Sequence, residues 1–231
     1  MPSENPPRNQ AIRRRRLTRR LIRHHGPLAL IAALFYLAAM AILPADDPIF
    51  VASMATAYAS LALIVATLLI GPLQLLRRRP NPVSGDLRRD IGIWAGLLGV
   101  AHMVIGLQVH LRGRPWEYFL SSLDQPWWTA LRTDPFGLAN HSGLIGGLLL
   151  VILLALSNDL TLRGLGSKRW KALQRLNYAL LVLVGGHGLL YQQIEKREAS
   201  YVGLLIGLLA VVLIAQLAGV GVRLRSARRS Q

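Results

Sequence analysis

The chain has 231 residues, of which 52% are hydrophobic, yet its formal net charge is +16. This combination excludes an ordinary soluble domain, and a nucleic-acid-binding protein would account for the charge but not for the long apolar runs. The sequence contains no cysteine, which excludes disulfides, thiolate-held iron–sulfur clusters, a catalytic cysteine and covalent haem attachment.

Six segments are apolar and long enough to cross a membrane, since a span needs about 20 residues. They are roughly 27–45, 51–76, 91–111, 138–157, 176–194 and 200–221. The first follows an arginine-rich stretch, but it lacks a convincing cleavage site, so we expect an uncleaved span. We therefore predict an all-α membrane protein. A six-transmembrane helical bundle over 27–222 lies between basic cytoplasmic tails at 1–26 and 223–231.

Lysine and arginine orient these spans. The two tails and the loops 77–90 and 158–175 together hold 22 of the 27 basic residues. By the positive-inside rule these segments face the cytoplasm, so both termini are cytoplasmic and the protein is multi-pass in a bacterial-type inner (plasma) membrane. His24 and His25, in the first tail, are expected among the lipid headgroups.

The longest outer connection, 112–137, is rich in aromatic residues, among them Trp116, Trp127 and Trp128. Tryptophan favours the headgroup level of a membrane. We expect a short helix or hairpin on the outer surface that caps whatever the spans enclose; the alternative is a simple interfacial anchor.

Two histidines lie inside spans, His102 in 91–111 and His187 in 176–194. Each lies about eleven residues from the cytoplasmic end of its span, about 16 Å at 1.5 Å per residue. The two spans run in the same direction, so both imidazoles are expected at one depth. An ionisable side chain inside a span is costly and usually functional.

Glycines accompany both histidines and leave room for a neighbouring helix or a flat ring. They are Gly96, Gly99 and Gly106 in one span, and Gly185, Gly186 and Gly188 in the other.

Two imidazoles suit the axial positions of one b-type haem, whereas zinc needs three or four ligands and no carboxylate lies deep in a span. We predict one haem b with His102 and His187 as its iron ligands. Filling both axial positions favours electron transfer over oxygen binding. The alternative is two polar residues that hydrogen-bond neighbouring helices.

Further polar residues lie near the outer ends of the spans. His110 and His141 are placed to contact a haem propionate, a quinone or each other, or are simply polar residues at a wet boundary. Arg112 and Arg114 are candidates to neutralise haem propionates.

The run LRRDIGIWAGLLGVAH resembles the third-span motif of ferric reductase-like transmembrane domains. The runs DPFGLANHSGLIGGLLLVILLALSND and LGSKRWKALQRLNYALLVLVGGHGLLY resemble the fourth span, basic loop and fifth span of that family. The similarity covers roughly 57–194 and is greatest to its branch of haem-binding membrane subunits of the bacterial periplasmic protein-methionine-sulfoxide reductase system.

The resemblance implies a b-type haem at His102 and His187. Many members carry a second fifth-span histidine, thirteen residues before the position of His187, where this chain has Gln174. The inner partner on the third span would fall near Arg89. An inner haem therefore lacks its usual ligands, and we expect a single haem.

These observations predict an electron-transfer subunit rather than a complete enzyme. Electrons would enter from quinol or a flavin reductase and leave to an outer-side acceptor, a periplasmic oxidoreductase or ferric iron, docked on the 112–137 loop. The alternative is a non-redox six-helix scaffold or transporter that has lost haem. Ion-coupled transport is disfavoured because the spans lack deep carboxylates.

Overall fold

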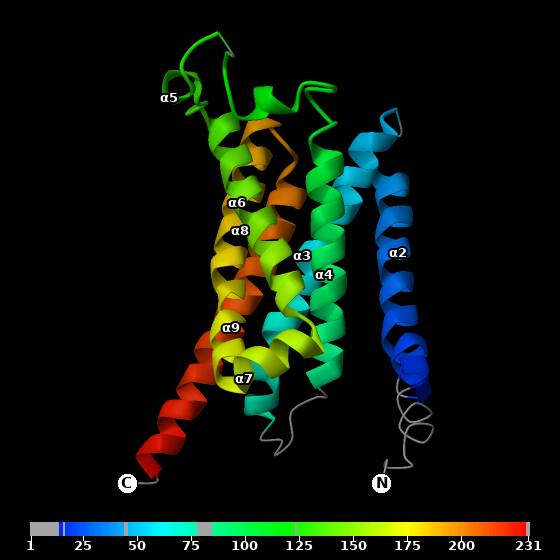
Figure 1. Cartoon of the computed structure of the whole chain (residues 1–231), viewed down its shortest axis with the longest axis vertical. Helices are drawn as coiled ribbons and strands as arrows, with labels where there is room; N and C mark the ends of the chain where they lie inside the picture. The colour runs from blue at the N-terminus through cyan, green and yellow to red at the C-terminus, as the bar shows by residue number, and fades with distance from the viewer. Residues whose placement is uncertain (1–13, 16, 44–45, 78–84, 123, 230–231) are drawn as a thin grey trace, which may run out of the picture.

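The computed structural model describes residues 14–15, 17–43, 46–77, 85–122 and 124–229. Six long helices are α2 (Gly26–Ile42), α3 (Pro48–Leu76), α4 (Gly85–Gly106), α6 (Pro135–Leu156), α8 (Leu176–Ile194) and α9 (Ala199–Arg229). Shorter elements are η1 (Leu21–His25), η2 (Pro115–Tyr118), α5 (Trp127–Ala130) and α7 (Asp159–Leu173). The described residues contain no strand, so the all-α prediction is confirmed for them (Figure 1).

Four helices are long and apolar enough to cross a membrane: Leu17–Ile42, Pro48–Leu76, Pro135–Leu156 and Ala199–Arg225. The other two predicted spans also form long helices, α4 and α8, but both are less apolar. Charged residues occupy the first turns of α4, and glycine, histidine and glutamine interrupt the apolar run of α8. Length and composition alone therefore do not identify α4 and α8, the helices that carry His102 and His187, as membrane spans.

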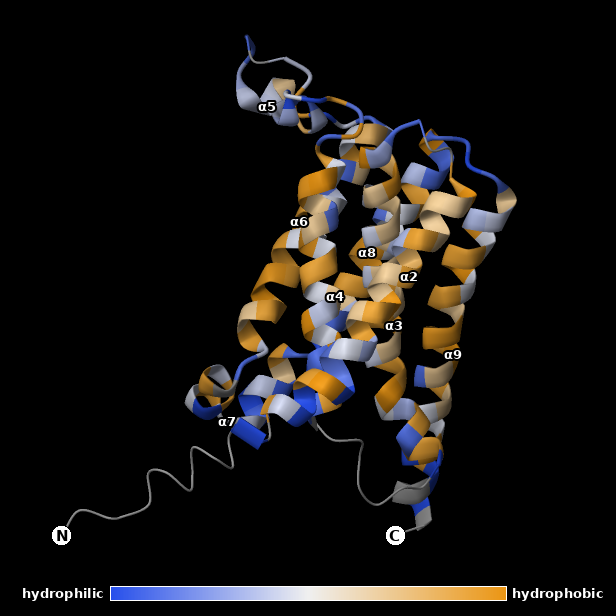
Figure 2. Cartoon of the chain, turned by 90° about the vertical axis from the view of Figure 1, so that its right-hand side faces the viewer, coloured by the Kyte–Doolittle hydropathy of each residue, from blue (hydrophilic) through white to orange (hydrophobic). Residues whose placement is uncertain are grey.

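The long helices form one bundle around α3. Helix α3 packs against α2, α4 and α9, while α6 packs against α4 and α8. The sides of the bundle are predominantly hydrophobic and the polar residues gather at its two ends (Figure 2). The first and the last described residues lie at the same end of the bundle (Figure 1). Some basic residues of the predicted tails and loops lie outside the described part of the chain: those of 1–13, Arg16, Arg78 and Arg79. The last two residues also lie outside it.

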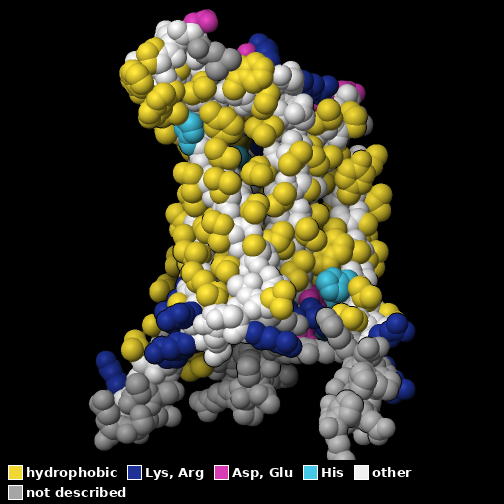
Figure 3. All heavy atoms as spheres, in the orientation of Figure 1, with side chains coloured by type: hydrophobic (Ala, Val, Ile, Leu, Met, Phe, Trp, Pro, Cys, Tyr) yellow, Lys and Arg dark blue, Asp and Glu magenta, His cyan; other side chains and the backbone are white. Residues whose placement is uncertain are grey.

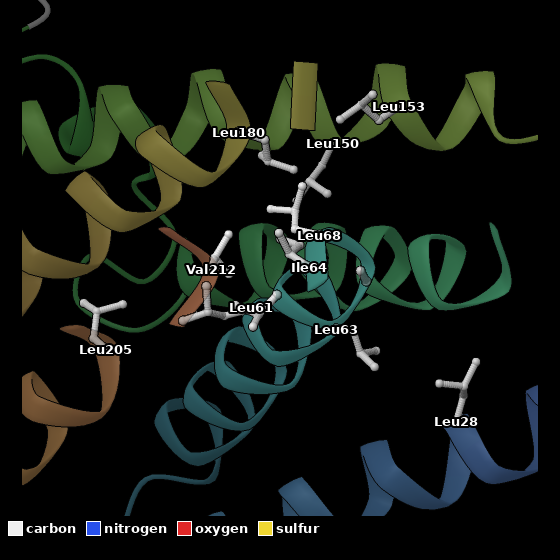
Figure 4. Packing of buried hydrophobic residues seen from close by; sticks show 12 residues of the cluster. Leu28, Leu61, Leu63, Ile64, Leu68, Leu150, Leu153, Leu180, Leu205 and Val212 are labelled. Carbon is white, nitrogen blue, oxygen red and sulfur yellow. The ribbon is translucent and has the colours of Figure 1, made fainter. Parts of the chain in front are cut away.

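The core lies where α3 meets the helices on either side of it (Figure 4). Ile64 and Leu68 of α3 pack with Leu150 of α6, Leu180 of α8 and Val212 of α9, all of them buried. Burying each such side chain contributes about 1.5–3 kcal/mol in water. Between helices in a membrane, van der Waals packing takes the place of this hydrophobic contribution. The core lies toward the end of the bundle where the chain begins and ends.

The connection 158–175 is a helix and not a loop. Helix α7 begins after Asn158, whose side chain accepts a hydrogen bond from the Thr161 amide at 2.8 Å. It bends at Gly166, where φ is +72°, a conformation that glycine adopts at little cost. The Trp170 indole donates to the Leu156 carbonyl at 2.8 Å, which holds α7 across the end of the bundle (Figure 1).

Helix α4 ends earlier than the predicted span, at Gly106. The reason is Tyr118 of η2, a buried side chain whose hydroxyl donates to the Gly106 carbonyl at 3.1 Å. The same hydroxyl accepts from the amides of His110, at 2.9 Å, and Leu111, at 3.1 Å. One phenol therefore satisfies backbone groups that the ended helix leaves unpaired.

A fully buried carboxylate holds the N-terminal helix, which comprises the described residues 14–15 and 17–42 and includes η1 and α2, to the bundle. Asp90 of α4 pairs with the Arg20 guanidinium, with His24 Nδ1 at 2.7 Å and with His25 Nε2 at 3.6 Å. The Trp94 indole donates to His25 Nδ1 at 3.0 Å. Both imidazoles therefore have an acidic partner on α4, and their expected place among lipid headgroups stays a prediction.

This cluster makes the attachment of the N-terminal helix dependent on pH. Asp90 lies just before the predicted span 91–111; burial alone would raise its pKa, but Arg20 and His24 lower it below 3.8. A carboxyl group whose pKa is lower in the folded state stabilises that state at neutral pH. This stabilisation is lost as the pH falls through the pKa of the folded state.

We expect hydrogen-exchange protection of 21–28 to fall between pH 6 and pH 3. Asp90→Asn should show low protection at both pH values; equal protection in both proteins would contradict this account.

Candidate functional site

A cavity of about 280 Å³ lies inside the bundle between α3, α4, α6 and α8. Helices α4 and α8 each pack against α3 and α6, and Tyr118 of η2 and Leu205 of α9 complete the lining of the cavity. Its wall is mainly apolar, and both mid-helix histidines, His102 and His187, line it. The size is close to the lower end of small-molecule pockets, about 300 Å³.

His102 and His187 come from different helices but meet in this cavity. Their ring centroids lie 6.1 Å apart and the ring planes cross at 73°. Imidazole nitrogens bind transition metals at about 2 Å, and a ring centre lies ~1 Å beyond its nitrogen, so two imidazoles on one metal have centres about 6 Å apart. The observed separation is close to the value for imidazoles on opposite sides of one metal.

Backbone carbonyls fix the protonation of both rings. His102 Nδ1 lies 2.9 Å from the Ser53 carbonyl oxygen, and His187 Nδ1 lies 2.8 Å from that of Ala139. A carbonyl only accepts, so each Nδ1 carries the hydrogen and each Nε2 keeps its lone pair. No described residue hydrogen-bonds either Nε2. Metal-binding histidines are commonly oriented by such a bond from the other nitrogen.

The described residues contain no group of three or more His, Asp or Glu that could hold a metal ion. The arrangement therefore offers two nitrogen ligands and an apolar surround. Such a pair suits a metal whose remaining ligands come from a macrocycle, and it does not suit tetrahedral zinc.

The predicted glycines act mainly in helix packing. A Cβ at Gly99 would lie 2.5 Å from Leu150 Cδ1, and one at Gly188 would lie 2.9 Å from Leu205 Cδ2. The glycine that makes room for an imidazole is Gly143 of α6, where a Cβ would lie 2.6 Å from His187 Nδ1. Sequence reasoning did not single it out, because it lies 44 residues from its partner.

Aromatic rings connect His187 to the far end of the cavity. The Tyr191 ring lies 5.0 Å from the His187 ring, and its hydroxyl donates to Asn140 Oδ1 at 2.8 Å. His110 stacks on Tyr191 with centroids 6.0 Å apart. Tyr191 follows His187 by four residues and so shares its helix face, a spacing visible in the sequence.

An ion-pair group follows beyond Tyr191. His110 Nε2 lies 2.9 Å from Glu195 Oε1, and Arg197 Nη2 lies 2.5 Å from Glu195 Oε2. Burial alone would raise the pKa of Glu195, but the hydrogen bond from His110 and the Arg197 charge lower it below its usual value. The Arg197 guanidinium also lies over the Phe50 ring, 5.2 Å from its centroid. Glu195 and Arg197 both line the cavity.

The other predicted residues lie away from the cavity. His141 Nε2 is 3.1 Å from the Arg132 carbonyl oxygen. Arg112 pairs with Asp47 at 2.5 Å and Arg114 with Glu117 at 3.1 Å, both at exposed positions. The cation in the cavity wall is instead Arg197, from the α8–α9 connection.

No protein-family model matches the chain. The site itself consists of two oriented imidazoles in a mainly apolar cavity with a cation in its wall.

Proposed function

We propose that the chain is a haem b-binding integral membrane protein that transfers electrons. The observation that carries the proposal is the pair of imidazoles, His102 and His187, 6.1 Å apart in one cavity with both Nδ1 atoms bonded to carbonyl oxygens. A bound haem would supply a one-electron redox centre. His102 and His187 would hold its iron, and ligation by two imidazoles would favour electron transfer over oxygen binding.

The protein's own residues would position the haem, enclose it and set its potential. The Ser53 and Ala139 carbonyls present each Nε2 for ligation, and the apolar cavity wall keeps water away. Hydrophobic surroundings and hydrogen bonds to the axial ligands are the means by which proteins set a haem potential. The proposal includes a single haem. Gln174, where many family members have a second histidine, caps the end of α7.

Six membrane crossings are part of the same proposal. Helices α4 and α8 run alongside the four apolar helices (Figure 1). The end of the bundle with α7 and both chain ends carries most of the basic residues and would face the cytoplasm. Figure 3 shows these arginines and lysines as a band at that end.

The opposite end would face outward and receive the electron acceptor. Trp127 and Trp128 of α5 lie there with 69% and 66% of their surfaces exposed. Their segment projects beyond the bundle (Figure 2). Exposed aromatic surface of this kind is suited to a protein partner, since tryptophan is enriched at interfaces. The proposed acceptor is a periplasmic oxidoreductase or ferric iron.

Arg197 takes the role that was expected of Arg112 and Arg114 beside the haem propionates. Arg197→Gln should weaken haem binding and lower the midpoint potential by tens of millivolts. Two unit charges about 10 Å apart interact by about 1–2 kcal/mol at an effective dielectric constant of about 20. A cation near the haem favours its reduced state, so removing the cation lowers the potential. A redox titration followed by absorbance measures the shift. Arg112→Gln and Arg114→Gln are the controls, and an equal shift in either would contradict the assignment.

Electron transfer itself is tested with the purified protein in lipid nanodiscs. We expect a quinol, or a flavin reductase with NADH, to reduce the haem, and ferric citrate or a periplasmic oxidoreductase to reoxidise it. A haem that dithionite reduces but neither donor reduces within minutes would contradict the electron-transfer role while leaving haem binding intact.

A further inference from the structure

The N-terminal helix presents two different faces. On one face, Arg20 and His24 contact Asp90 of α4. On another, three arginines spaced four residues apart, Arg15, Arg19 and Arg23, line a shallow surface pocket that also includes Arg14, Thr18 and Ile22. We call Arg15, Arg19 and Arg23 the arginine stripe. Because Asp90 fixes the rotation of the helix, the stripe faces away from the bundle.

The stripe carries charge that the described protein does not neutralise. No described carboxylate lies within ion-pair distance of its guanidiniums, and Asp90 is occupied by Arg20 and two imidazoles. Like charges four residues apart on a helix repel one another. An anion between them would remove this repulsion, and guanidinium groups match phosphate oxygens in geometry.

Apolar side chains stand beside the stripe and identify the kind of anion. Leu17, Leu21 and Ile22 are 49%, 59% and 70% exposed, and Ile22 lines the same pocket as the arginines. The helix continues directly into α2, which is apolar and has a single buried residue, Leu28. A helix with cations and exposed aliphatic groups at the start of an apolar span suits a phospholipid, whose phosphate and acyl chains meet at that level.

We propose that the arginine stripe is a binding site for the phosphate headgroup of an anionic phospholipid, and that Asp90 orients the helix to form it. Free phosphate would use the guanidiniums but leave Leu21 and Ile22 in water, so the lipid is the better match. The inference does not depend on haem binding.

Native mass spectrometry of the detergent-solubilised full chain tests the proposal, with phosphatidylglycerol as the probe and phosphatidylcholine as the zwitterionic comparison. The triple variant Arg15→Gln, Arg19→Gln, Arg23→Gln should bind phosphatidylglycerol about a hundredfold more weakly, since each basic residue contributes about fivefold. The variant changes only exposed side chains, so it should elute and unfold as the wild type does.

A matched control removes three arginines from the same end of the bundle, in α9: Arg223→Gln, Arg225→Gln, Arg228→Gln. It should keep wild-type affinity. Three outcomes would overturn the proposal: unchanged binding in the stripe variant, an equal loss in the control, or equal binding of phosphatidylcholine. Displacement of the lipid by millimolar inorganic phosphate would also overturn it, because the ligand would then be free phosphate.

Discussion

Replacing either His102 or His187 by alanine is expected to abolish stable haem binding. The two rings are the imidazoles that line the cavity, and their centroids lie 6.1 Å apart, close to the separation of two imidazoles on opposite sides of one metal. With one imidazole gone, one axial position has no protein ligand and the apolar wall offers no replacement. We expect the haem-to-protein ratio of the purified variants, measured as the pyridine haemochrome, to fall below about a tenth of the wild-type ratio.

His110→Ala and His141→Ala are the matched controls, because both remove an imidazole without touching the pair. His141 is bonded to the Arg132 carbonyl, and His110 is separated from His187 by Tyr191. Both variants should keep most of their haem. Wild-type haem content in the double variant His102→Ala, His187→Ala would show that the ligands lie elsewhere.

Gly143→Val should cause a comparable loss while leaving both ligands in place. A Cβ at this position would lie 2.6 Å from His187 Nδ1 and 2.8 Å from its Cε1, so the ring must move. Moving it breaks the Nδ1 bond to the Ala139 carbonyl and turns Nε2 out of position. Misplacing a metal ligand or its hydrogen-bond partner typically costs 10- to 100-fold in affinity.

Gly146→Val is the control for this change, three residues along the same helix. A Cβ there would lie 3.7 Å from Leu183 and Val184, an ordinary contact away from the imidazole. We expect haem affinity, measured by titration of the haem-free protein, to change much less than in the Gly143 variant. Equal affinities in the two variants would mean that Gly143 does not position His187.

Much of this arrangement could be predicted from the sequence. Apolar runs separated by basic segments predict the long helices, and equal counts from the basic ends predict that His102 and His187 meet. What the sequence did not reveal depends on contacts between distant segments. Gly143, the α6 residue that leaves room for the His187 ring, resembles any other glycine in a span, and Arg197 resembles any other loop cation.

Two further features were not evident from the sequence. The segment 158–175 reads as a basic loop, yet an Asn158 cap and a glycine bend allow a surface helix there. His24 and His25 lie among arginines in the sequence, and their partner Asp90 is 65 residues after His25. Polarity alone does not distinguish a side chain in solvent from one with a buried partner.

The most direct test of the central claim is a dithionite-reduced minus oxidised absorbance spectrum of the purified wild-type protein, combined with its haem-to-protein ratio. The proposal predicts the reduced α-band of a six-coordinate b-type haem and one haem per chain. A protein that is folded, pure and expressed with ample haem, but shows no reducible haem band, would contradict the proposed function.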